Sequence, residues 1–206
     1  MKREDFFSKW SALHGGAQIS GIVKAWLSIS YRCARISSAL HISANFLTLL
    51  GVLFAIAMVA SPLSLWCIPL LVLSLFSDGI DGSVAMFQGR ESAWGAILDS
   101  VADRITEALW LFIAYKVGVP AWIAITLWLI ASTQEYMRAR IASLGFSDIG
   151  VVTPAERPMR ASLLFILLVS YHLDFSSAVF LSSAFLLLQS YSAYLVARSA
   201  YRALSA

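Results

Sequence analysis

Four aspartates lie in or beside segments that are otherwise hydrophobic enough for a membrane: Asp78, Asp81, Asp99 and Asp103. A carboxylate at membrane depth costs about 2.5 to 3.5 kcal/mol on insertion scales, so four together require neutralisation by cations or protons. Each pair shares one helix face, because its members are three or four positions apart. Two such helices facing each other would form an oxygen-rich site that suits hard divalent cations such as Mg²⁺. The aspartates therefore predict a functional site.

Composition predicts that this site belongs to a membrane protein. Hydrophobic residues make up 59% of the 206 residues and charged residues only 13%, whereas soluble domains carry about 25% charged residues. The chain has room for about six spans of roughly 20 residues. We therefore expect an all-α integral membrane protein with six transmembrane helices after an N-terminal amphipathic juxtamembrane helix.

Hydropathy and turn residues place these elements along the chain. The predicted spans are 45–62, 65–88, 95–117, 119–143, 158–173 and 175–202. Residues 18–36 form an amphipathic pattern typical of a helix lying among lipid headgroups; an ordinary solvated helix packed on the protein is the alternative. We expect one domain over 1–206, with 1–40 as a cytoplasmic amphipathic segment and 45–202 as the six-helix bundle.

The basic residues predict the orientation of the spans. Most of them fall in the segments before the first span, between spans two and three, around the junction of spans four and five, and at the end of the chain. Only Lys116 belongs to the opposite side. By the positive-inside rule, both termini of this multi-pass cell-membrane protein are cytoplasmic, and the aspartates lie near the cytoplasmic face. The basic balance is thus a sign of topology, and we expect no nucleic-acid partner.

The aspartates also form part of a longer motif. The spacing D-x2-D-G-x2-A-R-x8-G-x3-D-x3-D is matched by Asp78, Asp81, Gly82, Ala85, Gly95, Asp99 and Asp103. This motif resembles the signature of the CDP-alcohol phosphotransferase family. Met86 departs from it, because the signature has arginine there. SANFLT at 43–48 is similar to the family's P-N-x-x-T element, with Ala44 in place of proline.

The resemblance implies a reaction and roles for these residues. Enzymes of this family displace CMP from a CDP-linked group with an alcohol, and the lipid-synthesising members use CDP-diacylglycerol as donor. By resemblance, Asp78, Asp81 and Asp99 are ligands of two Mg²⁺ ions, or Mn²⁺, and Asp103 completes the cluster and acts as general base. The implied CDP-lipid contacts are Asn45, Thr48, Gly82, Ala85 and Arg90. The family also implies a homodimer in the lipid bilayer.

A second group of residues bears on the acceptor. The stretch 135–160 carries an arginine pair and then an E-R-P-x-R element, which resembles the phosphatidylinositol-phosphate synthases of actinobacteria. Their acceptor is myo-inositol 1-phosphate, and guanidinium groups suit its phosphate. The resemblance assigns that phosphate to Arg138, Arg140, Arg157 and Arg198, with Arg160 in support. Glu135 is discordant, because a carboxylate repels phosphate unless it is paired, for example with Arg138.

Other interpretations stay open at this point. Cytoplasmic loop arginines are also expected from topology alone and attract anionic lipid headgroups. The acceptor could instead be glycerol 3-phosphate or inositol. Because Met86 lacks the arginine's charge, a noncatalytic paralogue is a further alternative. A cation or proton transporter would use the same carboxylates, but the inverted repeats typical of transporters are not visible.

Overall fold

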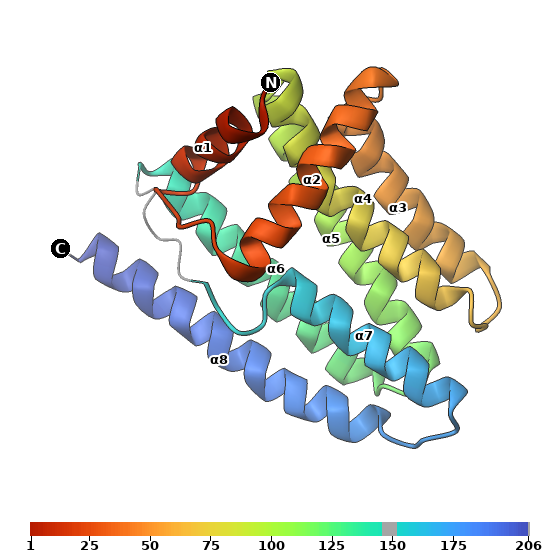
Figure 1. Cartoon of the computed structure of the whole chain (residues 1–206). Helices are drawn as coiled ribbons and strands as arrows, with labels where there is room; N and C mark the ends of the chain where they lie inside the picture. Colours follow the sequence, from red (N-terminus) through yellow and green to blue (C-terminus); the bar gives the residue numbers. More distant parts are fainter. Residues whose placement is uncertain (146–151, 206) are drawn as a thin grey trace. The chain divides into compact units, whose positions relative to one another are not determined.

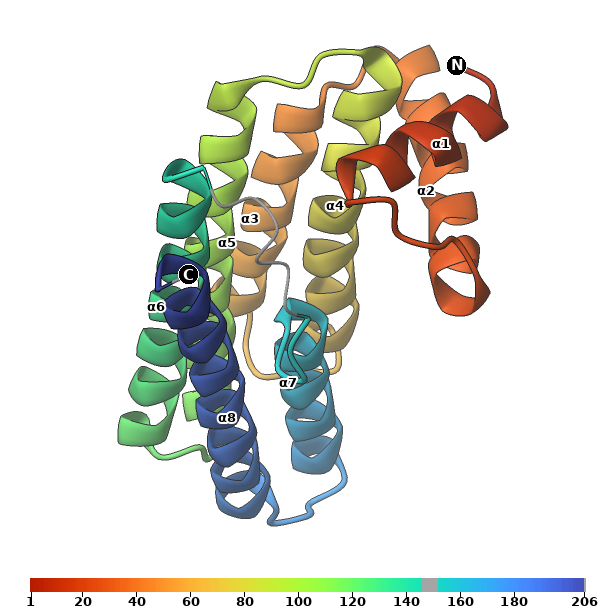
Figure 2. The same cartoon turned by 90° about the vertical axis from the view of Figure 1, so that its left-hand side faces the viewer.

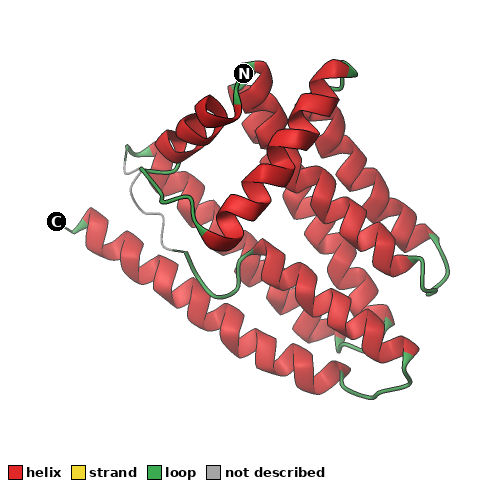
Figure 3. Ribbon diagram, in the orientation of Figure 1, coloured by secondary structure: helices red, strands yellow, loops and turns green. Residues whose placement is uncertain are grey.

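A computed structural model describes residues 1–145 and 152–205, and every regular element in those ranges is an α-helix (Figures 1 and 3). The eight helices of the described residues are α1 (Arg3–Leu13), α2 (Gly21–Ala39), α3 (Ala44–Ala60), α4 (Cys67–Gln88), α5 (Ala93–Lys116), α6 (Ala121–Ser143), α7 (Arg157–His172) and α8 (Ala178–Leu204). The expectation of an all-α fold is confirmed.

The helices α3 to α8 coincide with the six predicted spans to within a few residues. Within residues 1–145 and 152–205, α4 and α8 are the helices that are individually long and apolar enough to cross a membrane, and α2 with α3 qualifies as a pair bent by 109°. α5 carries several charged residues within its length, and α7 has 16 residues, fewer than the about 17 to 25 of a typical span. The structure thus shows two or three candidate spans, and the count of six stays a prediction.

α2 occupies the segment expected to be amphipathic. Its apolar residues face two ways: Leu27 and Ala34 are buried, whereas Ile22 and Ile29 are exposed. The ring of Trp26 lies against Gly79 of α4, where an added Cβ would come within 3.0 Å of it. The segment is therefore a helix that packs on α4 and leaves part of its apolar surface uncovered. Its position in a headgroup layer stays a prediction.

The described residues belong to two compact units. Unit 1 comprises Met1–Phe54 and Leu73–Asp103, and unit 2 comprises Ala55–Val72 and Arg104–Ala206. The helices α3, α4 and α5 contribute residues to both units. The expectation of one domain over 1–206 stays a prediction, and each unit is described by itself.

The core of unit 1 includes a helix that the sequence did not predict. Phe6 of α1 is fully buried and packs with Leu27 of α2 and Met86 of α4. Its ring also meets the ring of Tyr31 edge to face at 5.5 Å. α1 has five apolar residues among its eleven, too few turns for a clear helical period. Its buried Phe6 anchors it, with Phe7 and Trp10 packed against the same cluster.

A glycine sets the distance between α3 and the part of α4 that carries Asp78. A Cβ added to Gly51 would lie 3.1 Å from the backbone oxygen of Ser74 and 3.7 Å from the backbone nitrogen of Asp78. The Ser74 hydroxyl donates a 2.8 Å hydrogen bond to the Gly51 carbonyl oxygen. Small residues at helix interfaces allow such close backbone approach. This contact fixes where the first aspartate lies relative to α3.

Unit 2 is held together in part by buried amides. α8 runs alongside α6 and α7 (Figure 2). The Gln189 side chain donates to the Gln134 side-chain oxygen at 3.1 Å, and Gln134 donates to the Thr153 hydroxyl at 3.3 Å. Gln134 and Gln189 are completely buried. Such bonds suit helices in an apolar medium, because hydrophobic burial contributes little to helix association there.

Glu156 organises the start of α7. Its carboxylate accepts hydrogen bonds from the Thr153 backbone N–H at 2.8 Å and hydroxyl at 2.7 Å. The Arg138 guanidinium of α6 donates to both carboxylate oxygens, at 2.6 and 2.9 Å. Burial raises the pKa of Glu156, but the bonds from Arg138 and Thr153 outweigh it and lower the pKa to about 2. The fold thus stabilises the charged form of the Glu156 carboxyl.

This pKa predicts how stability depends on pH. Glu156→Gln should lower the free energy of unfolding by about 1 to 2 kcal/mol at neutral pH, a figure reduced for solvent screening. Because the folded-state pKa lies below the ordinary value of 4.5, the wild-type contribution is complete above that value and is lost as pH falls towards 2. Thermal unfolding in detergent should show the two proteins converging across that range. Glu4→Gln, at an exposed position of α1, is the matched control, and a gap that stays constant with pH would contradict the assignment.

Candidate functional site

Three of the four predicted aspartates form one cluster in unit 1. One carboxylate oxygen each of Asp78, Asp99 and Asp103 lies within 4.8 Å of the others, and all three residues are half-buried. α4 supplies the first and α5 the other two, whose spacing of four residues puts them on one face. Carboxylates this close repel one another unless a positive charge or protons intervene. The all-oxygen donor set fits a hard divalent cation, so this cluster could hold a metal ion.

Asp81 is not among the three aspartates whose oxygens lie within 4.8 Å of one another, and its carboxylate is hydrogen-bonded to Thr48 of α3. It is 6% exposed and accepts hydrogen bonds from the Thr48 hydroxyl and from the Gly82 backbone N–H, the latter at 2.5 Å. A buried carboxylate needs such partners. The bonds fix the direction of the Asp81 side chain, and its role as a metal ligand stays a prediction.

A pocket of about 230 Å³ in unit 1 brings together all five residues predicted to contact the CDP-lipid. Its lining includes Asn45, Thr48, Gly82, Ala85 and Arg90. Asp81 and Asp99 line the same pocket. The start of α3, Gly82 of α4 and the aspartates Asp81 and Asp99 are therefore neighbours in space, although Asn45 and Asp99 are 54 positions apart in the sequence.

Two glycines of the motif have different surroundings. A Cβ added to Gly82 would meet no heavy atom within 4 Å, so this position leaves the pocket open. A Cβ at Gly95 would lie 3.1 Å from the Ser92 hydroxyl oxygen and 3.4 Å from the Asn45 side-chain oxygen. Gly95 therefore permits close packing of α5 on the start of α3.

The rim of the pocket contains residues that the sequence did not single out. Ser92 and Glu91 line it beside Arg90. The Ser92 hydroxyl accepts a 3.0 Å hydrogen bond from the Gly95 backbone N–H, which is the arrangement of a helix N-cap. A serine immediately before an apolar helix was the available signal. The Lys9 ammonium forms a 2.5 Å ion pair with Glu91, and this bond lowers the pKa of the Glu91 carboxyl.

Met86 proves to be a packing residue. Its side chain is 3% exposed and lies in the core cluster with Phe6 and Leu27. The backbone oxygen of Met86 accepts a 3.4 Å hydrogen bond from Lys9. Methionine at this position of the motif thus helps to dock α1 and α2 on α4. Arg90 is the cation among the described residues that line the pocket.

In unit 2, two predicted acceptor arginines are paired with carboxylates. Arg138 contacts Glu156 and also Glu135, the latter at 3.2 Å. Arg160 lies 2.9 Å from Glu107 and 3.6 Å from Glu135. Glu135 therefore contacts both arginines, and its carboxylate is paired with Arg138.

The other three predicted arginines of unit 2 have different settings. Arg157 donates a 2.7 Å hydrogen bond to the Thr106 hydroxyl, and its guanidinium lies 5.2 Å from the centre of the Trp110 ring. Arg140 is exposed and donates to the Ser143 hydroxyl at 3.3 Å. Arg198 is exposed on α8. The structure thus brings Arg138 and Arg160 together through a shared carboxylate.

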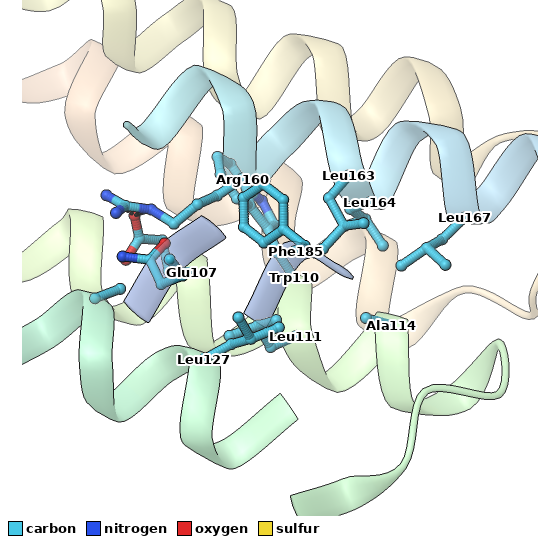
Figure 4. Close-up of a pocket in the computed structure, with 12 residues that line it drawn as sticks. Glu107, Trp110, Leu111, Ala114, Leu127, Arg160, Leu163, Leu164, Leu167 and Phe185 are labelled. Atoms are coloured by element: carbon cyan, nitrogen blue, oxygen red, sulfur yellow. Dashed lines mark hydrogen bonds and ion pairs between the residues drawn. The ribbon is translucent and has the colours of Figure 1, made fainter. Parts of the chain in front are cut away.

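A narrow apolar cavity begins at the ion pair of Arg160 and Glu107. Arg160 and Glu107 lie at one end of its lining, and Ala114 and Leu167 lie at the other (Figure 4). Leucine side chains and Trp110 form most of the wall between them. Its volume of about 20 Å³ is close to the space that one water molecule needs. This cavity is too small for a nucleotide or a sugar phosphate.

Known proteins are similar to this chain in sequence. The family model described as CDP-alcohol phosphatidyltransferase matches residues 41–195. An archaetidylinositol phosphate synthase of Aeropyrum pernix is 37% identical over 117 residues, which cover 56% of this chain and 59% of that protein. Phosphatidylinositol phosphate synthases of Cutibacterium acnes and Corynebacterium glutamicum are 33% and 34% identical, over 57% and 62% of this chain and 62% and 63% of their own lengths.

The matched region thus spans about 60% of the length of these relatives. The residues 41–195 that the family model matches include the aspartate cluster, the pocket beside it and the Arg138–Glu156 pair. Since the family model covers residues 41–195, most of the described fold, this membrane protein belongs to the CDP-alcohol phosphatidyltransferase family.

Proposed function

We propose that this chain transfers the phosphatidyl group of CDP-diacylglycerol to myo-inositol 1-phosphate and releases CMP. The observation that carries the proposal is the pocket of unit 1, where the five residues expected to contact the CDP-lipid lie beside the aspartates. Relatives named for the synthesis of phosphatidylinositol phosphate or archaetidylinositol phosphate support the choice of acceptor.

The aspartates would hold the divalent cations of the reaction. Asp78, Asp81, Asp99 and Asp103 are the proposed ligands of two Mg²⁺ ions, with Mn²⁺ as a substitute. The three clustered carboxylates suit this role, and the hydrogen bond from Thr48 orients the fourth. A bound divalent cation stabilises the negative charge that develops on diphosphate oxygens.

The remaining residues bind the donor and move one proton. Asn45, Thr48, Gly82 and Ala85 shape the donor pocket, and Arg90 offers its charge to the diphosphate. The acceptor hydroxyl oxygen bonds to the phosphorus that carries diacylglycerol, and the bond from that phosphorus to the oxygen of CMP breaks. CMP leaves with the electron pair, and Asp103 accepts the hydroxyl proton as general base.

The arginines of unit 2 would bind the phosphate of the acceptor. Arg138, Arg140, Arg157 and Arg198 take this role, with Arg160 in support. Guanidinium groups match phosphate oxygens in charge and in their planar pairs of donors. The exposure of Arg140 and Arg198 leaves them accessible to a soluble sugar phosphate.

The same proposal includes the arrangement in the membrane. The protein is a multi-pass protein of the cell membrane, with six spans, both termini in the cytoplasm and α2 lying in the headgroup layer. The exposed apolar residues of α2 and the distribution of basic residues support this arrangement. We also propose that it forms a homodimer.

The function is tested by turnover of the purified protein with CDP-diacylglycerol and a panel of acceptors. CMP release should require Mg²⁺, should stop when the metal is chelated and should return when Mg²⁺ is restored. Among inositol 1-phosphate, inositol, glycerol 3-phosphate and serine, only the first should give a phospholipid product. A product that forms with inositol or glycerol 3-phosphate but not with inositol 1-phosphate would overturn the choice of acceptor. Undiminished turnover without metal would overturn the mechanism.

The role of Asp103 is tested separately. Asp103→Asn should lower kcat by about 10²- to 10⁴-fold, the usual range for loss of general acid–base catalysis. Extra Mg²⁺ should not restore the rate, because a neutral amide cannot take the proton. The control is Asp5→Asn, the same change at an exposed position of α1, which should keep full activity. A variant at Asp103 with more than half of the wild-type kcat would exclude the residue as the base.

A further inference from the structure

Three arginines and three glutamates of unit 2 form one continuous chain of ion pairs. Its links are Arg104–Glu107 at 3.0 Å, Glu107–Arg160 at 2.9 Å, Arg160–Glu135 at 3.6 Å, Glu135–Arg138 at 3.2 Å and Arg138–Glu156 at 2.6 Å. Positive and negative charges alternate and are equal in number. An anion that binds to Arg138 or Arg160 therefore meets a neutral network in which carboxylates already hold these guanidinium groups.

Two of the three glutamates are firmly built into the fold. Glu107 is 2% exposed and accepts 2.9 Å bonds from the Nε and Nη2 atoms of Arg160. Glu156 receives two bonds from Thr153 in addition to those from Arg138. Removal of either carboxylate would take the nearest ion-pair partner from Arg160 or Arg138, which destabilises the fold.

Glu135 is the loosely held member of the network. Its side chain is 29% exposed, and its contacts with Arg138 and Arg160 measure 3.2 to 3.6 Å. These distances exceed the 2.7 to 2.9 Å typical of strong charge-assisted bonds. Glu135 and Arg138 are three positions apart on α6, so a change of side-chain rotamer can separate them without movement of the backbone.

We propose that the Glu135 carboxylate occupies the place of a phosphate oxygen on Arg138 and Arg160, and thereby limits the affinity of this site for phosphorylated acceptors. The inference rests on the proposed function, because it assigns those arginines to the acceptor. A phosphate dianion must either displace Glu135 or bind beside a like charge, and both weaken binding. Glu135 is thus a specificity-determining residue that sets the concentration of acceptor at which the enzyme works.

The test uses Glu135→Gln, which keeps the size of the side chain and removes its charge, in the full-length protein. The KM for inositol 1-phosphate should fall about tenfold, while the KM for CDP-diacylglycerol stays the same. The affinity for inorganic phosphate, measured by calorimetry without turnover, should rise by a similar factor. Glu135→Ser should likewise lower the KM for inositol 1-phosphate and raise the affinity for phosphate. Agreement of the two variants would show that the effect comes from loss of the carboxylate. Glu4→Gln, with the same change of charge at an exposed site, should alter neither.

The outcomes separate this inference from the proposed function. If the wild type uses inositol 1-phosphate and Glu135→Gln shows an unchanged or higher KM, Glu135 merely holds the arginines in place and the inference is wrong. If the wild type uses only an acceptor without phosphate, the proposed acceptor is wrong. The inference about Glu135 is then tested only by the calorimetric affinity for inorganic phosphate. A tenfold gain in the variant then still supports Glu135 as the competing carboxylate, and equal affinities overturn it.

Discussion

Electrostatic repulsion between carboxylates is the constraint on which the candidate site of unit 1 depends. Asp78, Asp99 and Asp103 bring their oxygens within 4.8 Å of one another, a distance at which like charges in a poorly hydrated setting are costly. The surrounding structure favours that approach: Gly51 lets α3 lie close to α4, and Gly95 lets α5 pack against the start of α3. A fold that holds these groups together without neutralisation would lose stability, and the cluster could hold a metal ion.

The two units differ in how their charged side chains are arranged. Unit 1 concentrates negative charge where an oxygen-seeking cation can balance it. The ion-pair network of unit 2 balances its own charges, because Glu107, Glu135 and Glu156 accompany three arginines. A charge-balanced network needs no external ion to persist. It also means that binding of a phosphate must compete with groups of the protein itself, which makes affinity sensitive to a single carboxylate.

The sequence predicted those features that depend on local spacing or on a fixed motif. The helices α3 to α8 were predicted to within a few residues, and Asn45, Thr48, Gly82, Ala85 and Arg90 do line one pocket. α1 was missed, because it is only eleven residues long and its aromatic residues Phe6, Phe7 and Trp10 give no clear periodic pattern. The packing role of Met86 and the pairing of Arg138 with Glu156 were also missed, since both depend on contacts between residues distant in sequence. The number of spans could not be decided by hydropathy, because the residues that build the site make α5 polar.

We propose that carboxylates of α4 and α5 together bind a divalent cation. The most direct measurement is Mn²⁺ binding to the purified protein, followed by electron paramagnetic resonance without any substrate. The wild type should bind Mn²⁺, excess Mg²⁺ should displace it, and Asp78→Asn should weaken binding at least about tenfold, because one of three clustered ligands loses its charge. Equal Mn²⁺ affinity in the wild type and the variant would show that this cluster is not the metal site.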